Sequence, residues 1–214
     1  REVHQKAAVL YRKQARFKLI TTGKINQKNL LFEEQHLERL RKASRYFAYP
    51  FDAEELRQKI EEECQSCEVN QDYRLRISLN KSGEIELSRQ ILTPLSPTFC
   101  QAKLCLQEAD LQQAFTYFKT THRPHLSLGK QEIIYHNAAG ELLETSIGNL
   151  VLKIAGKLYT PPTSLGILPG IYRQHLLETG QVEEKVLTVA DLNQAETIYG
   201  CNAVRGLYEL EVEP

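Results

Sequence analysis

The order of hydrophobic patterns along the chain is the feature that most constrains its fold. Apolar residues recur at helical spacing over residues 33–47, and a second helical pattern covers residues 52–64. Alternating apolar and polar residues then predict two strands, at 75–79 and 85–87, joined by a tight turn. Beyond residue 130, short apolar stretches separated by turns predominate. The sequence therefore predicts an α+β protein, with helices and strands first and a strand-rich part afterwards.

Boundary signals accompany both early helices. Pro50 ends the first pattern, because proline cannot continue a helix. Asp52, followed by Glu55 three residues later, is typical of a capping box and starts the second helix. The residues expected to be buried are Leu37, Leu40, Ala43, Ser44 and Phe47 in the first helix, and Leu56, Ile60 and Cys64 in the second.

A proline-rich break at Thr93–Pro97 marks the expected boundary between two lobes. We expect residues 1–16 to form a helix or linker, residues 17–97 a small N-terminal lobe, and residues 98–214 a larger C-terminal lobe that contains Lys119. The other expected strands are at residues 17–20, 103–107, 133–135, 142–143, 150–154, 157–160, 198–199 and 207–212, with helices at 168–179 and 188–195.

Charge and apolar content narrow the classes of function. Lys and Arg number 27 and so do Asp and Glu, which argues against a nucleic-acid binder, since such proteins usually carry a basic surplus. No stretch of 18 apolar residues occurs, so no transmembrane helix is predicted. No secretory leader opens the chain, and the expected location is cytoplasmic.

The five cysteines predict free thiols, since their number is odd and no secretory signal accompanies them. Cys64 and Cys67 have CxxC spacing, but no second pair and no histidine set completes a zinc site, so no metal is expected. The chain contains no Met, and Arg1 stands at position 1. This absence and the basic opening hint that the chain is the tail of a larger protein, although a free-standing protein stays an open alternative.

Several residues could carry chemistry, although each alone is a weak signal. Lys119 directly follows two aromatic residues, Tyr117 and Phe118. A lysine in an apolar pocket becomes nucleophilic because its pKa falls, whereas a surface lysine keeps its ammonium group in water and is not activated. Arg39 is either a surface charge or a phosphate ligand. Glu144 is an acid within an apolar strand, and Leu168–Ile171 leads into a helix whose first N–H groups suit a phosphate. An amine, an arginine, an acid and a helix N-terminus are together the parts that pyridoxal phosphate needs.

Six motifs in a fixed order are more specific than any single residue. They are Phe17–Ile20, His36–Leu40 with Ser44, Lys119–Arg123, Gly140–Leu150, Leu168–Arg173 and Cys201–Gly206. The set resembles the class IV (fold type IV) family of pyridoxal-phosphate aminotransferases, and most closely its aminodeoxychorismate lyase branch, including lyase domains fused behind aminodeoxychorismate synthase. The resemblance implies a two-lobed fold like that of D-amino-acid aminotransferase, pyridoxal 5'-phosphate (PLP) as cofactor, and a homodimer.

The same resemblance implies roles for the residues of the cofactor frame. Lys119 is the lysine that forms the Schiff base with the cofactor and then acts as a base. Arg39 binds the phosphate, together with the backbone N–H groups of Gly170 and Ile171. Glu144 binds the pyridine nitrogen and keeps it protonated, so that the ring can accept electrons from the substrate carbon.

Other positions are matched less closely. Asn202 and Ala203 match the segment that completes the cofactor and substrate pocket. Asn149 matches an asparagine just after the acid, where a structural role is as consistent as contact with the ligand. Thr21 stands where fused lyase domains often have Glu, and Tyr172 stands where many relatives have Thr, which puts a hydroxyl contact to the phosphate in doubt.

On the substrate side, Thr22 is a candidate catalytic residue. Thr22, Arg76, Arg123 and Arg205 are candidates for binding substrate carboxylates, since guanidinium groups suit that task. Arg76 could equally be an outward strand residue, and Arg123 could form a salt bridge within the protein.

The lyase resemblance implies conversion of 4-amino-4-deoxychorismate to 4-aminobenzoate and pyruvate, a step of folate biosynthesis, through aldimine formation, proton abstraction and loss of enolpyruvate. An alternative is a branched-chain or D-amino-acid aminotransferase of the same fold. A third hypothesis is a non-catalytic interaction domain, against which the intact Lys119, Arg39 and Glu144 argue.

Overall fold

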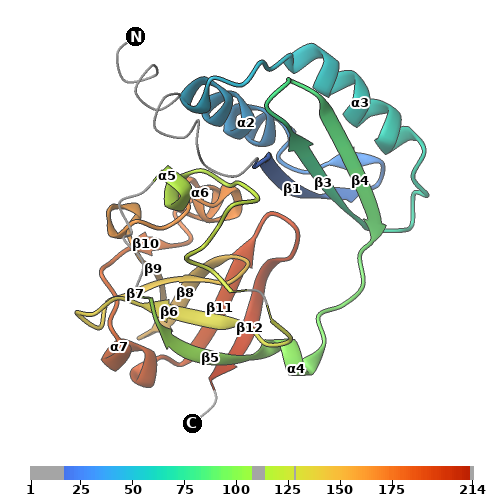
Figure 1. Ribbon diagram of the computed structural model, residues 1–214. Helices are drawn as coiled ribbons and strands as arrows, with labels where there is room; N and C mark the ends of the chain where they lie inside the picture. The colour runs from blue at the N-terminus through green and yellow to red at the C-terminus, as the bar shows by residue number, and fades with distance from the viewer. Residues whose placement is uncertain (1–16, 108–113, 128, 213–214) are drawn as a thin grey trace. The chain divides into compact units, whose positions relative to one another are not determined.

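The computed structural model describes three stretches of the chain, residues 17–107, 114–127 and 129–212 (Figure 1). The helix or linker predicted for residues 1–16 lies outside them. Among the described residues, no helix is long and apolar enough to cross a membrane.

The chain divides into two compact units. The first contains the described residues up to Thr93 together with Phe118–His122. The second contains the described residues between Pro94 and Tyr117 and those from Arg123 onward. The division at Thr93 differs from the predicted lobe boundary after residue 97, although it falls within the predicted proline-rich break. The grouping of Phe118–His122 with the first unit was not expected from the sequence.

The first unit is an antiparallel sheet with two helices. Its elements are β1 (Leu19–Asn26), β2 (Asn29–Leu30), α2 (Glu33–Phe47), α3 (Ala53–Gln65), β3 (Tyr73–Leu79) and β4 (Ile85–Ile91). The strand order is β2-β1-β3-β4, and all neighbours are antiparallel. Helix α2 packs against β1, and α3 packs against β2 and β4. The residues predicted to be buried on both helices are buried, so the helical spacing identified the core faces correctly.

Local signals explain where the helices begin. The side chain of Asp52 accepts hydrogen bonds from the backbone N–H groups of Glu54 and Glu55, at 2.9 and 3.1 Å. The Glu55 carboxylate pairs with Lys59 at 3.1 Å, so Asp52 is an N-cap without the reciprocal bond of a capping box. A complete capping box, formed by Thr188 with its partner three residues later, starts α7 in the second unit.

The second unit is dominated by one mixed sheet. Its elements are α4 (Pro97–Cys100), β5 (Gln101–Leu106), α5 (Ala114–Tyr117), β6 (Ile133–His136), β7 (Leu142–Thr145), β8 (Asn149–Ile154), β9 (Lys157–Thr160), a short turn of 3₁₀-helix (Thr163–Leu165), α6 (Ile171–Glu178), β10 (Glu183–Glu184), α7 (Val189–Gln194), β11 (Thr197–Asn202) and β12 (Gly206–Val212). The strand order is β10-β9-β8-β11-β12-β5-β6-β7.

Ring closure positions the polar residues of this unit. Strand β7 also pairs with β8, so the strands from β8 through β11, β12, β5 and β6 to β7 close into a ring. In this pairing Glu144 lies opposite Asn149, and Asn149 lies opposite Cys201 on β11. The closure therefore places Glu144, Asn149 and Cys201 at paired positions on the adjacent strands β7, β8 and β11.

Candidate functional site

Lys119 lies in the first unit, on a segment that pairs with the edge of β1. The backbone N–H of Ile20 donates to the carbonyl of Lys119 at 2.9 Å, and the N–H of Thr121 donates to the carbonyl of Lys18 at 2.9 Å. Thr120, between them, is completely buried. This pairing fixes the backbone that carries Lys119, and it is the physical reason why Lys119 groups with the first unit and not with the predicted C-terminal lobe.

Aromatic packing supports the same segment. The ring of Phe118 lies 4.6 Å from that of Tyr46 and 5.4 Å from that of Phe47, centroid to centroid, and both partners are on α2. The aromatic neighbour that drew attention to Lys119 in the sequence is thus part of the packing between this segment and α2.

Helix α2 also carries Arg39 and His36, a residue of the His36–Leu40 motif to which the sequence assigned no role. The His36 side chain is completely buried, and its Nδ1 shares a hydrogen bond of 2.6 Å with the hydroxyl of Thr21. Its Nε2 faces the backbone of β1, where a Cβ on Gly23 would lie 2.5 Å away. Burial, and then the positive charges of Arg39 and Lys119, lower the pKa of His36 to about 3. The imidazole is therefore neutral and adds no third positive charge near the two cations.

Because His36 stays neutral in the folded protein at mildly acidic pH, where the unfolded chain is protonated, we predict a loss of stability in mild acid. The folded pKa of about 3 is below the ordinary value of 6.5, so the unfolded chain binds a proton that the folded chain excludes. Stability should be complete above pH 6.5 and should decrease as the pH falls toward 3, by at most roughly 1.4 kcal/mol per pH unit from this residue. Urea unfolding of the wild type and of His36→Gln, measured between pH 7 and pH 4, tests this prediction. If the free energy of unfolding falls with pH equally steeply in both proteins, the prediction is wrong.

Thr22 and Arg76 lie side by side on the sheet. They are directly opposite each other in the antiparallel pair of β1 and β3, so their side chains project from the same face. Thr21 points toward α2, where it bonds to His36, and neighbouring residues of a strand alternate between faces. The structure thus brings these two predicted residues together on the face that does not carry the helices.

In the second unit, Glu144 is a buried acid with a buried cation beside it. Its side chain is 3% exposed, and one carboxylate oxygen lies 3.8 Å from Nη2 of Arg123. Burial lowers the pKa of Arg123, and the nearby Glu144 and Tyr135 oppose that shift. Of the two alternatives left open for Arg123, the geometry favours the salt bridge within the protein over a substrate carboxylate.

Asn149 holds the turn that leads into α6. Its Nδ2 donates to the carbonyl of Leu168 at 2.8 Å. Its Oδ1 occupies the space that a Cβ on Gly170 would need. Helix α6 begins at Ile171 with Gly170 as N-cap, and the first N–H groups of a helix have no partner within it. Asn149 thus makes a structural contact that holds this turn, and the start of α6 at Gly170 and Ile171 presents backbone donors.

The turn between β11 and β12 is organised by Asn202. Its Oδ1 accepts hydrogen bonds from the backbone N–H groups of Val204 and Arg205, each at 2.9 Å. Asn202 thereby fixes the conformation of Ala203 and Arg205, next to the strand end that pairs with Asn149. The predicted cofactor residues of the second unit are therefore contiguous, and Arg205 lies on the same turn.

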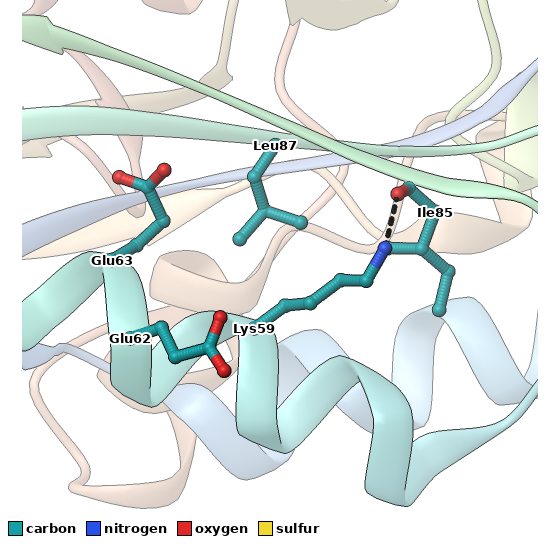
Figure 2. Close-up of a pocket in the computed structure, with 5 residues that line it drawn as sticks. All are labelled: Lys59, Glu62, Glu63, Ile85 and Leu87. Atoms are coloured by element: carbon teal, nitrogen blue, oxygen red, sulfur yellow. Dashed lines mark hydrogen bonds between the residues drawn. The ribbon is translucent and has the colours of Figure 1, made fainter.

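A separate surface pocket of about 390 Å³ lies on the first unit, lined by Lys59, Glu62, Glu63, Ile85 and Leu87 (Figure 2). The ammonium group of Lys59 points across it and donates to the carbonyl of Ile85 at 3.0 Å. None of the predicted site residues lines this pocket. Among the described residues, no group of three or more His, Cys, Asp or Glu could hold a metal ion.

Comparison with known proteins decides the family. The model of the amino-transferase class IV family matches residues 18–210, nearly the whole chain. The chain belongs to this family. The predicted family is thereby confirmed. The class IV family consists of PLP-dependent aminotransferases and lyases.

Three of the proteins that the chain matches illustrate the similarity. The chain is 29% identical to the aminodeoxychorismate lyase of Saccharomyces cerevisiae over 119 residues, which are 44% of this chain and 32% of the yeast protein. It matches a Mesorhizobium loti structure, provisionally assigned as an amino-acid aminotransferase, with a TM-score of 0.80 and 26% identity, covering 92% of this chain and 100% of that one. It matches the PLP-bound form of a hypothetical aminotransferase from Mycobacterium tuberculosis with a TM-score of 0.76 and 16% identity, covering 92% and 81%. The predicted α+β fold of type IV aminotransferases is confirmed.

Proposed function

We propose that the protein is a PLP-dependent 4-amino-4-deoxychorismate lyase that releases 4-aminobenzoate and pyruvate. The observation that carries the proposal is the buried acid Glu144 beside Arg123, in a chain that matches the class IV family over residues 18–210. The choice of the lyase reaction rests on the motifs from Lys119 to Arg123 and from Cys201 to Gly206, and on the yeast relative that is an aminodeoxychorismate lyase.

The residues present fit the cofactor in each unit. The first unit supplies an amine, Lys119, on a backbone fixed by β1, and a guanidinium, Arg39, on α2. The second supplies a buried carboxylate, Glu144, and the start of α6, where Gly170 leaves no room for a side chain beside Asn149. When bound, PLP supplies an electron sink for the negative charge that develops on the substrate carbon.

Each of these residues then has a defined task. Lys119 would hold the cofactor aldehyde through Nζ, and the same nitrogen is the group that would accept and return a proton at the substrate carbon. Glu144 would accept a hydrogen bond from the pyridine nitrogen and would favour the protonated ring. Arg39 and the N–H groups of Gly170 and Ile171 bind the phosphate, since a helix N-terminus attracts anions.

The substrate has two carboxylates, which calls for cationic or hydroxyl ligands. We assign this task to Thr22 and Arg76, which project from one face of the first unit's sheet, and to Arg205 on the turn held by Asn202. Guanidinium groups can bind a carboxylate through two hydrogen bonds. The homodimer, the cytoplasmic location and fusion to a synthase stay predictions.

The lyase assay is the direct test. PLP-loaded protein is incubated with enzymatically made 4-amino-4-deoxychorismate, and 4-aminobenzoate is followed by fluorescence while pyruvate is measured with a coupled dehydrogenase. We expect both products in equal amounts, and neither with Lys119→Ala. A protein that binds PLP but releases no 4-aminobenzoate would contradict the lyase proposal.

An amino-acid aminotransferase is the second candidate, and the Mesorhizobium loti structure, covered over its whole length, favours it. The same preparation is incubated with 2-oxoglutarate and either a branched-chain or a D-amino acid. Glutamate formation at a rate above that of the lyase reaction would select this candidate. Protein that binds no PLP at all would instead favour the non-catalytic hypothesis.

A further inference from the structure

The salt bridge between Arg123 and Glu144 gives Arg123 a task that the family resemblance did not assign. Glu144 lies on β7 between Leu143 and Thr145, both completely buried. Removal of a carboxylate from water favours its neutral form. A neutral carboxylic acid would form a hydrogen bond to an unprotonated pyridine nitrogen. Only the carboxylate form can balance the positive charge of a protonated ring. Glu144 therefore needs a nearby positive charge to act as the proposed partner of the ring nitrogen.

Arg123 supplies that charge without taking a hydrogen-bond position on the acid. The distance of 3.8 Å between Nη2 of Arg123 and Oε2 of Glu144 is that of an ion pair and exceeds a hydrogen bond. A guanidinium group stays protonated inside proteins, so Arg123 is a permanent positive charge beside the acid. The side chain of Arg123 is only 17% exposed, which limits the solvent screening of this interaction.

The loop that carries Arg123 is held in place by its own contacts. The backbone N–H of Leu126 donates to the carbonyl of Arg123 at 3.1 Å. The hydroxyl of Tyr135, on β6, accepts a hydrogen bond from the N–H of Ser127 at 2.8 Å. Strand β6 also pairs with β7, the strand of Glu144, so the arginine and the acid are attached to adjacent strands.

The environment of Nε of Arg123 indicates that the Arg123–Glu144 pair has a functional role and is not there for stability alone. Among the described residues, this buried nitrogen has no hydrogen-bond partner. A buried donor without a partner is a cost to folding, and such groups in native proteins call for an explanation. We infer that Arg123 is a positioning residue that keeps Glu144 ionised and oriented toward the ring nitrogen of the cofactor, and that it does not bind substrate. This inference rests on the proposed function, because the ring nitrogen belongs to PLP.

A double-mutant cycle with a nitrogen-15 readout tests the inference. Wild-type, Arg123→Met, Glu144→Gln and the double variant are loaded with PLP labelled at the pyridine nitrogen, and the NMR shift reports whether that nitrogen is protonated. We expect a protonated nitrogen in the wild type and in Arg123→Lys, and a deprotonated one in Arg123→Met and Glu144→Gln. Arg123→Met should weaken PLP binding about 10-fold in the wild-type background and have almost no effect in Glu144→Gln, as for coupled sites.

Two controls separate the inference from a structural effect and from the proposed function. Arg89→Met breaks another arginine–glutamate pair, with Glu63 at 3.1 Å and in the first unit, and should leave the nitrogen shift and PLP affinity unchanged. In protein without cofactor, the infrared carboxyl band that Glu144→Gln removes should be that of a carboxylate in the wild type and of a neutral acid in Arg123→Met. Failure of the wild type to bind PLP would refute the proposed function alone, because the infrared comparison needs no cofactor.

The inference is overturned if Arg123→Met keeps the ring nitrogen protonated, or if it weakens PLP binding equally in the presence and absence of the Glu144 carboxylate. An increase in KM with an unchanged nitrogen shift would overturn it in favour of a substrate ligand. If Arg123→Met does not fold, Arg123→Gln takes its place in the cycle with the same expected results.

Discussion

Replacement of Lys119 by Ala should abolish turnover while PLP binding is weakened and not lost. Lys119 both anchors the cofactor and moves the proton, so its removal should lower kcat by about 10⁴-fold or more. Arg39, Glu144 and the start of α6 remain in the variant and still offer ligands to the phosphate and the ring nitrogen. Turnover is measured as 4-aminobenzoate released, and PLP affinity by equilibrium dialysis.

Lys103, on β5, provides the matched control for this variant. Its side chain is exposed, so Lys103→Ala removes a lysine of the second unit without removing a proposed cofactor ligand. It should keep turnover within a factor of about two, the range of ordinary surface substitutions. Turnover by Lys119→Ala close to that of the wild type would contradict the proposed role.

Replacement of Gly170 by Ala should lower the affinity for PLP about 100-fold and leave the affinity for pyridoxal, which lacks the phosphate, nearly unchanged. The new Cβ would overlap with Oδ1 of Asn149, which is itself held by the carbonyl of Leu168. The turn must therefore shift, at an overpacking cost of about 1–3 kcal/mol that falls on the phosphate donors. Fluorescence titration with each ligand measures the two affinities.

A second substitution makes this prediction more specific. Combining Gly170→Ala with Asn149→Ala removes the overlapping oxygen and should recover part of the lost PLP affinity. Gly129→Ala is the control, since its nearest neighbours would lie 3.7 Å from a new Cβ. Equal losses of affinity for PLP and pyridoxal in Gly170→Ala would argue against a phosphate site at the start of α6.

The local structure of the chain was predictable because its signals are local. The helical spacing of Leu37, Leu40 and Phe47 marked the buried face of α2, and Asp52 marked the start of α3. The first strand was predicted at residues 17–20, whereas β1 runs from Leu19 to Asn26, because Thr21, Thr22 and Gly23 give no apolar alternation. These residues are held in the strand by their pairing with β3, which the local pattern does not reveal.

Long-range pairings could not be predicted in the same way. The pairing of the Lys119 segment with β1 joins residues about a hundred positions apart, and no local pattern encodes it. The closure of β7 onto β8 is equally invisible, although it places Glu144 opposite Asn149. The sequence therefore identified the candidate residues through motifs, but it did not reveal which unit holds Lys119.

The environments of His36 and Arg123 could not be predicted from the sequence, because they depend on contacts with other elements. His36 lies in the apolar stripe of α2, next to Leu37, and this position was the available signal for its burial. Its contact with Thr21 and its neutral state depend on the neighbouring strand. The choice between a substrate ligand and a salt bridge for Arg123 depended on the position of Glu144, twenty-one residues later.

The central claim, a cofactor bound covalently through one lysine, has a direct chemical test. The PLP-loaded protein is reduced with borohydride, digested and analysed by mass spectrometry. The account predicts a phosphopyridoxyl group on Lys119 and an unmodified chain in Lys119→Ala. Modification of a different lysine, or none on protein saturated with PLP, would contradict it.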